Sequence, residues 1–252
     1  PDVFADLTTN VHNHWDRGLL GMALHPNFPS VPELYVLSTY DAPLRDTSLP
    51  AGSQDRPAAP YWGTPGVSGD PGPGTTGNGP SVSGRLSRLT VGPGNSWDNV
   101  EHVLVHDWGQ QYPSHSIGDL VFGADGALYA SAGDGASFNF QDYGQNDGLL
   151  GSTSLNDPSN QGGALRAQDL RSRVLGIPNP DDPVSLDGTI IRVDPSIVAG
   201  GAPLSDNPLI GDADPNAERI IAYGMRNPFR ITAKPGTNEI WSGDVGWTRW
   251  EE

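Results

Sequence analysis

The sequence predicts an all-β fold. The chain has 33 Gly and 24 Pro among 252 residues, a density at which long helices would be interrupted throughout. Short runs of β-branched and aromatic residues recur between clusters of Gly, Pro, Asp and Asn, the pattern of strands joined by turns. Seven Trp, seven Tyr and six Phe provide apolar surface for a core. No apolar run approaches the ~18 residues that a membrane-spanning helix needs.

The charge of the chain limits its partners. Thirty acidic residues against fourteen basic ones give a formal charge of -16. Nucleic acids and anionic membrane surfaces both bind basic faces, so we expect neither nucleic-acid binding nor membrane insertion. Neutral small molecules and cations such as Ca²⁺ are the favoured partners. Because the chain has no Cys, disulfides and thiolate metal sites are excluded within it.

Ten segments have the composition and the flanking turn residues of strands. They are Leu19–Leu24, Leu34–Tyr40, Arg85–Val91, His102–Trp108, Asp119–Phe122, Ala127–Ala132, Thr189–Val193, Arg219–Tyr223, Phe229–Ala233 and Glu239–Ser242. One short helix is predicted at Gln168–Leu175. Two segments are predicted as surface loops, Tyr61–Gly84, a low-complexity insertion, and Phe138–Gly163, because their composition cannot bury apolar area.

A strand–turn–strand unit occurs three times, starting at Leu19, Asp119 and Phe229. In each copy a polar turn joins two strands, and the second strand has an aromatic residue near its start. Repeated hairpins separated by further strands are typical of a β-propeller, with a β-sandwich as the alternative. Three blade starts fall short of a closed ring, and open strand edges are a liability. We therefore interpret residues 1–252 as an incomplete propeller, truncated at both ends.

Two polar positions precede the first strands of the second and third copies. His115 comes shortly before the second copy, and Asp134 ends the hairpin of that copy. Antiparallel pairing would bring them together, and a carboxylate behind a His fixes its tautomer and raises its basicity. Arg226 holds the equivalent position in the third copy, where it can bind an anion. A His satisfied within a loop and an Arg bonded to carbonyls are the structural alternatives.

Other motifs are weaker. His12 and His14 alternate as metal ligands in a strand would, but no third ligand accompanies them at a known spacing. The Asp–Gly pairs at Asp125, Asp134, Asp147 and Asp187 offer carboxylates to Ca²⁺, although most such pairs are simply turns.

Several motifs resemble the glucose/sorbosone dehydrogenase family, which includes soluble sugar dehydrogenases that use pyrroloquinoline quinone (PQQ). Residues 16–28 read DRGLLGMALHPNF, close to the family's GLLG-hydrophobic-HPDF signature. The order continues with GADGALY at 123–129, GD at 133–134, AQDL at 167–170, DGTIIRV at 187–193, DNP at 206–208 and YGMRNP at 223–228. The resemblance spans nearly the whole chain.

The resemblance implies a six-bladed β-propeller with PQQ over its axis and Ca²⁺ beside the cofactor. His115 matches the family's catalytic base, which takes a proton from the anomeric hydroxyl of a sugar. Asp134 matches its carboxylate partner. Arg226 and Asn227 match the residues that contact the cofactor, with Arg226 stabilising the reduced quinone. The backbone carbonyls of Gly246 and Trp247 align with the Ca²⁺ ligands.

The chain also differs from the glucose enzymes. Asp16 stands near the cofactor position where those enzymes have Gln, and the usual Pro is absent after Gly246. The ending GDVGWTRWEE is similar to the propeller of Hedgehog-interacting proteins.

The resemblance therefore implies PQQ- and Ca²⁺-dependent oxidation of a sugar hemiacetal to a lactone, with an electron acceptor as second partner. The expected location is the periplasm, the cell surface or the medium of a bacterium. A non-catalytic propeller that binds protein or glycan is one alternative, and a Ca²⁺-dependent hydrolase or lactonase is another.

Overall fold

The computed structural model describes residues 2–8, 11, 13, 16–40, 82–110, 114–135, 186–196, 201–212 and 214–246. Several sequence predictions lie outside this part of the chain. They are the helix at Gln168–Leu175, the loop at Phe138–Gly163, the histidines His12 and His14, and residues 61–81 of the low-complexity insertion.

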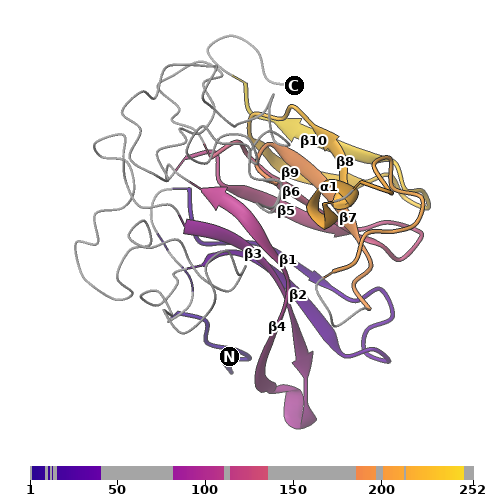
Figure 1. Cartoon of the computed structure of the whole chain (residues 1–252). Helices are drawn as coiled ribbons and strands as arrows, with labels where there is room; N and C mark the ends of the chain where they lie inside the picture. Colours follow the sequence, from indigo (N-terminus) through magenta and orange to yellow (C-terminus); the bar gives the residue numbers. More distant parts are fainter. Residues whose placement is uncertain are drawn as a thin grey trace.

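The described residues form ten strands in antiparallel sheets (Figure 1). Their bounds are β1 (Leu19–Leu24), β2 (Glu33–Tyr40), β3 (Val82–Val91), β4 (Trp97–Gln110), β5 (Ile117–Phe122), β6 (Leu128–Ala132), β7 (Thr189–Val193), β8 (Ile220–Tyr223), β9 (Pro228–Ala233) and β10 (Ile240–Asp244). Two sheets have four strands each, in the orders β1-β2-β3-β4 and β5-β6-β7-β8, and β9 pairs with β10. The all-β prediction is confirmed.

The predicted repeat corresponds to the first hairpin of each sheet. The pairs β1–β2, β5–β6 and β9–β10 are antiparallel, with Met22 opposite Val36, Val121 opposite Tyr129, and Thr232 opposite Trp241, and each pair contains one register shift. Each repeat therefore starts a new sheet, as a propeller blade does.

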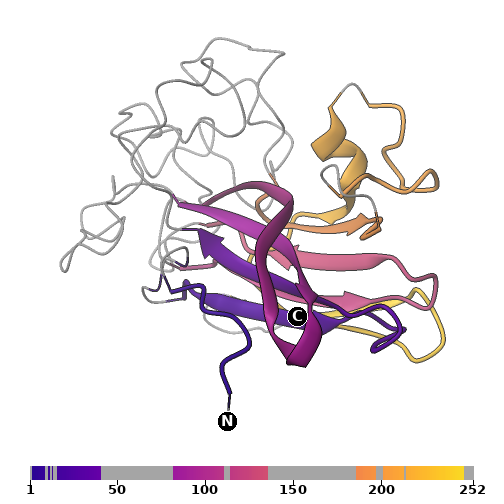
Figure 2. The same ribbon diagram turned by 90° about the horizontal axis from the view of Figure 1, so that it is seen from below.

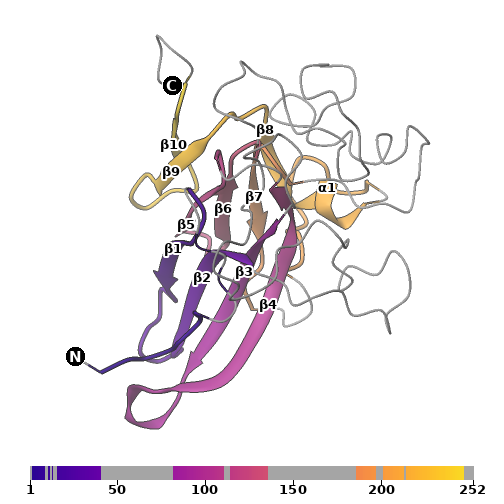
Figure 3. The same ribbon diagram turned by 90° about the vertical axis from the view of Figure 1, so that its left-hand side faces the viewer.

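The first strands of the three sheets lie side by side. β1 contacts β5, and β5 contacts β9, along one side of the molecule (Figure 3). Glycines permit the close approach, because a Cβ on Gly118 would lie 2.3 Å from the carbonyl oxygen of Pro228 in β9. At Gly21 of β1, a Cβ would lie 3.2 Å from the backbone nitrogen of Leu120. We call β1, β5 and β9 the inner strands.

The main core lies between the first two sheets. Tyr35 and Leu37 of β2 belong to one buried cluster with Leu128 and Ala130 of β6. Tyr35 also packs edge-on against Phe122, with ring centroids 5.3 Å apart. β6 is buried along its whole length, since Tyr129 faces the opposite way into a second cluster. The sheets thus stack face to face.

Some boundaries differ from the sequence prediction. Residues 82–84, assigned to the low-complexity insertion, belong to β3, because Ser83 and Gly84 pair with the end of β2. A short helix, α1 (Pro215–Arg219), was not predicted, and the Asp214 carboxylate caps it by accepting from Asn216 N. In Figure 2, α1 (orange) lies on the side of the molecule opposite the β9–β10 hairpin. None of the described helices is long and apolar enough to cross a membrane.

Candidate active site

The three inner strands each begin just after a predicted site residue. Asp16 precedes β1, His115 precedes β5 and Arg226 precedes β9. Hydrogen bonds join these turns: the N–H of His115 donates to Asp16 Oδ2 at 3.3 Å, and the N–H of Asp134 donates to the carbonyl of Arg226 at 2.9 Å. The segments that hold residues 16, 115, 134 and 226 therefore meet at one end of the inner strands.

A buried hydrogen bond joins His115 and Asp134. The distance from His115 Nδ1 to Asp134 Oδ1 is 2.8 Å, and the two side chains are 4% and 2% exposed. The proximity that antiparallel pairing predicted is thus present. When a carboxylate accepts from Nδ1–H, the neutral imidazole keeps its lone pair on Nε2. That tautomer is the one a general base requires at Nε2.

The backbone of His115 has an unusual conformation. Its φ is 51°, in the left-handed region that non-glycine residues seldom adopt, although His is among the more tolerant residues. Tertiary contacts hold it there, because the N–H of Gly135 donates to the carbonyl of His115 at 2.9 Å. Gly133 packs against the same carbonyl, where an added Cβ would lie only 2.4 Å away. Such over-determined strain is common at functional sites.

Asp244 is a member of this cluster that the sequence analysis missed. Its Oδ2 accepts from the N–H of Arg226 at 2.9 Å, and its Oδ1 accepts from the N–H of Asn227. Burial raises the pKa of the Asp244 carboxyl, and the negative charge of Asp134 adds to this, while the hydrogen bonds from Arg226 and Asn227 oppose it. The carboxylate therefore fixes the turn that carries both predicted cofactor-contacting residues.

The repeat contained a signal for Asp244. Gly133–Asp134 follows the second strand of one hairpin, and Gly243–Asp244 ends the second strand of the next. Both carboxylates bind the turn before the inner strand of their own sheet. In the first sheet Thr39 takes this position, since its Oγ1 accepts from the N–H of Gly18 at 2.8 Å.

The Arg226 guanidinium binds backbone carbonyls. Its Nη1 donates to the carbonyl of Val245 at 2.8 Å and to that of Gly246 at 2.9 Å. The N–H of Val245 in turn donates to the carbonyl of Asn227 at 3.0 Å. The turn before β9 and the residues after β10 are therefore joined through both backbone and side chain.

Some buried polar side-chain atoms at this end of the inner strands have no hydrogen-bond partner. Among them are Oδ1 of Asn227 and Oγ of Ser116, in residues that are 8% and 2% exposed. A buried polar group without a partner is costly and needs an explanation, such as a bound ligand or water. Asn227 thus has the free hydrogen-bonding capacity that a cofactor-contacting residue requires.

The predicted metal ligands are only partly within the described residues. The carbonyl of Gly246 is present and accepts from Arg226, whereas Trp247 lies outside the described part of the chain. Within that part, no cluster of three or more His, Asp or Glu side chains could hold a metal ion. Backbone carbonyls are also acceptable ligands for Ca²⁺.

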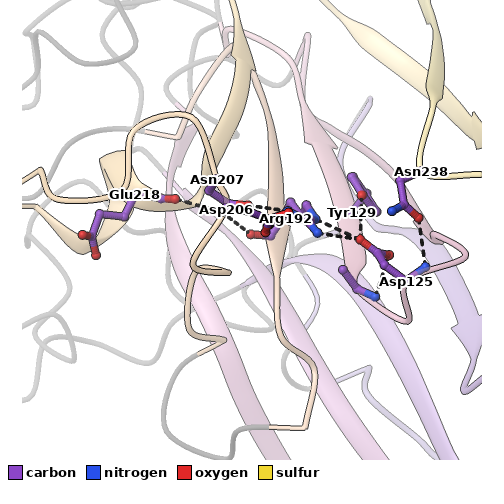
Figure 4. Close-up of polar contacts among 8 residues, drawn as sticks. Asp125, Tyr129, Arg192, Asp206, Asn207, Glu218 and Asn238 are labelled. Carbon is purple, nitrogen blue, oxygen red and sulfur yellow. Dashed lines mark hydrogen bonds and ion pairs between the residues drawn. The ribbon is translucent and has the colours of Figure 1, made fainter.

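The Asp125–Gly126 turn, one of the candidate calcium turns, belongs to a separate ion-pair network (Figure 4). Asp125 Oδ2 accepts from Nε and Nη2 of Arg192 at 3.1 and 2.7 Å. Arg192 Nη1 also donates to Asp206 at 2.6 Å. Burial and the Asp125 carboxylate raise the pKa of Tyr129 to about 12. This turn joins the far ends of β5 and β6, away from His115, and its carboxylate already has a cationic partner.

A cleft of about 810 Å³ lies over the outer face of the first sheet. Phe4 and Leu7 of the N-terminal segment line this cleft together with Val36 and Leu89 of the sheet. Arg17 is also one of the lining residues. Composition did not predict this cleft, because it depends on the path of the N-terminal segment.

Comparisons with known proteins agree with this architecture. The family model for glucose/sorbosone dehydrogenase matches residues 170–252. A protein from Thermus thermophilus, assigned as an oxidoreductase (glucose dehydrogenase), matches with a TM-score of 0.53 and 23% identity over 95% of this chain and 47% of its own.

Two further solved structures give similar values. The PQQ-bound form of an aldose sugar dehydrogenase from Streptomyces coelicolor has a TM-score of 0.55 and 17% identity, with 97% of this chain and 47% of its own covered. The soluble aldose sugar dehydrogenase from Escherichia coli, in its apo form, has a TM-score of 0.50 and 18% identity. The match covers 94% of this chain and 46% of the Escherichia coli chain. The chain thus spans about half the length of these structures. The predicted resemblance is confirmed: the fold is that of glucose/sorbosone dehydrogenase-like propellers.

Proposed function

We propose that this chain supplies the catalytic end of a sugar dehydrogenase that oxidises the hemiacetal of an aldose to a lactone, with PQQ as the oxidant. The observation that carries the proposal is the buried hydrogen bond between His115 and Asp134, next to the turn that holds Arg226 and Asn227. The family match and the PQQ-bound structural neighbour support the choice of reaction.

In this proposal His115 is the general base. Its Nε2 accepts the proton of the anomeric hydroxyl, and Asp134 stabilises the resulting imidazolium and keeps the ring oriented. The left-handed backbone of His115, held by Gly133 and Gly135, sets the position of the ring. When bound, PQQ supplies the quinone that accepts the hydride from the anomeric carbon.

The neighbouring turn would hold the cofactor. Asn227 offers the unpartnered, buried Oδ1 of its side chain. Arg226 supplies a fixed positive charge that compensates negative charge on the reduced cofactor. Asp16 completes the site from the first sheet, through its contact with the N–H of His115.

We include Ca²⁺ in the proposal, with the carbonyls of Gly246 and Trp247 as its ligands. Carbonyl oxygens suit this hard cation, and the acidic chain as a whole attracts cations. We also propose that the protein is exported by a bacterium, and that its electron acceptor is a separate partner.

The test is titration of PQQ into the protein with CaCl₂, followed by reduction of a redox dye on addition of aldoses. His115→Ala is expected to lower the turnover rate by a factor of about 10²–10⁴ with PQQ affinity unchanged. His25→Ala is the matched control, because His25 lies in the turn at the far end of β1, where its Nδ1 accepts from the N–H of Asn27.

Two results would contradict the proposal at different levels. If the protein binds no PQQ, the dehydrogenase function is wrong, and a non-catalytic binding propeller becomes the better interpretation. If PQQ binds and His115→Ala turns over sugar at the rate of the unaltered protein, His115 is not the base.

A further inference from the structure

Asp16 places a carboxylate in direct contact with the proposed base. Its Oδ2 accepts from the N–H of His115 at 3.3 Å, and the residue is exposed although His115 is buried. No described residue donates a hydrogen bond to the second carboxyl oxygen, Oδ1. The end of the inner strands that holds the base therefore presents an accessible negative charge.

No cation neutralises this charge within the part of the chain that the structure describes. The ion pairs found there do not include Asp16. Arg17, its neighbour in sequence, is buried at the lining of the cleft over the outer face of the first sheet. Asp125 differs in this respect, because Arg192 lies 2.7 Å from its Oδ2. The charge of Asp16 is thus able to act on a ligand that binds beside His115.

The groups that contact His115 are negatively charged on two sides. Asp134 accepts from the imidazole ring in the buried pair, and Asp16 accepts from the backbone N–H. Arg226 belongs to the adjacent turn, and its guanidinium donates to two backbone carbonyls after β10. A ligand that brings a positive charge to this place gains Coulomb energy, whereas a ligand with a negative charge loses it.

We propose that Asp16 gives the site a preference for aldoses that carry a protonated amino group, and a bias against aldoses that carry a carboxylate. This inference rests on the proposed function, because the sugar has to reach Nε2 of His115 to be oxidised. The ammonium group of an amino sugar is a suitable partner for the carboxylate of Asp16. A partly exposed ion pair of this kind changes relative affinity by about threefold or more.

Ratios between substrates test the preference. Asp16→Asn removes the charge and keeps a side-chain oxygen that can accept from the N–H of His115. With saturating PQQ and CaCl₂, kcat/KM is measured for glucosamine, glucose and glucuronate at a pH at which the amine is protonated. In Asp16→Asn the ratio of glucosamine to glucose is expected to fall by about threefold or more, and the ratio of glucuronate to glucose to rise by a similar factor. These ratios cancel any general change in turnover.

Asp98→Asn is the matched control for the loss of one charge. Asp98 is exposed near the start of β4, where Trp97 pairs with Val91 at the end of the first sheet away from His115. This variant is expected to keep both ratios of the unaltered protein.

Binding without turnover provides a second measurement. The methyl glycosides of glucosamine and glucose have no anomeric hydroxyl, so the protein cannot oxidise them. Isothermal titration should show that the unaltered protein binds the amino glycoside about threefold or more tightly than the neutral one, and that Asp16→Asn loses this difference.

The outcomes separate the two levels of the argument. Unchanged ratios in Asp16→Asn, an equal change in Asp98→Asn, or equal affinities of the unaltered protein for the two glycosides would overturn the preference and leave the dehydrogenase function in place. If none of these proteins oxidises any of the three sugars, the proposed function itself is wrong.

Discussion

Removing the carboxylate of Asp134 should destabilise the fold by an amount that depends on His115. The two side chains are 4% and 2% exposed and joined at 2.8 Å. In Asp134→Ala, His115 loses the buried acceptor for Nδ1–H, and a buried donor without a partner costs about 1–3 kcal/mol. We expect a loss of unfolding free energy at the upper end of that range, because a charged acceptor is removed.

A double-mutant cycle isolates the contribution of the pair. Urea unfolding of the unaltered protein, His115→Ala, Asp134→Ala and the double variant should give a coupling free energy of about 1–3 kcal/mol. Asp98→Asn is the control, since Asp98 accepts from Val100 N at an exposed position near the start of β4. Additive effects of the two single substitutions would contradict this expectation, because they would mean that the hydrogen bond adds no stability beyond what each residue adds separately.

Three further substitutions test other parts of this end of the molecule. Gly133→Ala would place a Cβ 2.4 Å from the carbonyl of His115, so chemical denaturation should show a loss of about 1–3 kcal/mol; an unaltered midpoint would argue against the close packing. Thr39→Val removes the hydroxyl that accepts from Gly18 N at 2.8 Å, with an expected cost of about 1–3 kcal/mol in the same assay; no loss would show that the first sheet does not need this contact. The pKa of Tyr129 is raised from 10.0 to about 12, so its contribution to stability is complete below pH 10 and falls as pH rises through 12. Tyr129→Phe should flatten the pH dependence of stability in that range, and an unchanged slope would assign the effect to other groups.

Sequence reasoning predicted the strands best where turn residues stand on both sides. The bounds of β1 (Leu19–Leu24) and β7 (Thr189–Val193) agree with the prediction. It failed where pairing extends a strand into an unfavourable composition. Gly84 belongs to β3 because it pairs with Thr39, and no local property of a Gly/Ser-rich segment indicates such a partner.

The helix α1 was missed for a different reason. It has only five residues, too few to show an apolar periodicity. Its one local signal is Asp214–Pro215, a capping residue followed by Pro at the first helical position. Two adjacent residues of this kind are also common in turns, so the sequence alone does not distinguish the two structures.

The positions of the candidate site and the contact between His115 and Asp134 were predictable, whereas the contacts of Arg226 were not. Comparing the repeats identified His115, Asp134 and Arg226, because each stands at an end of a hairpin. The same comparison extended to Gly243–Asp244 would have found Asp244 as the counterpart of Asp134. The direction of the Arg226 side chain was beyond such reasoning, since a long flexible side chain has several polar partners within reach.

The division of the site among three sheets makes its geometry depend on how the inner strands pack. His115 precedes β5, the turn of Arg226 and Asn227 precedes β9, and the carbonyl of Arg226 accepts from Asp134 N across the two sheets. Gly118 determines the separation of these strands, because an added Cβ would lie 2.3 Å from Pro228 O and 2.4 Å from Ser131 Oγ. Ser131 Oγ in turn donates to Pro228 O at 2.7 Å, so one hydroxyl ties β6 to the first residue of β9. A sheet-to-sheet shift of even about one ångström would therefore displace His115 relative to Arg226. The glycine and the small hydroxyl residue at this contact keep the two sheets close together.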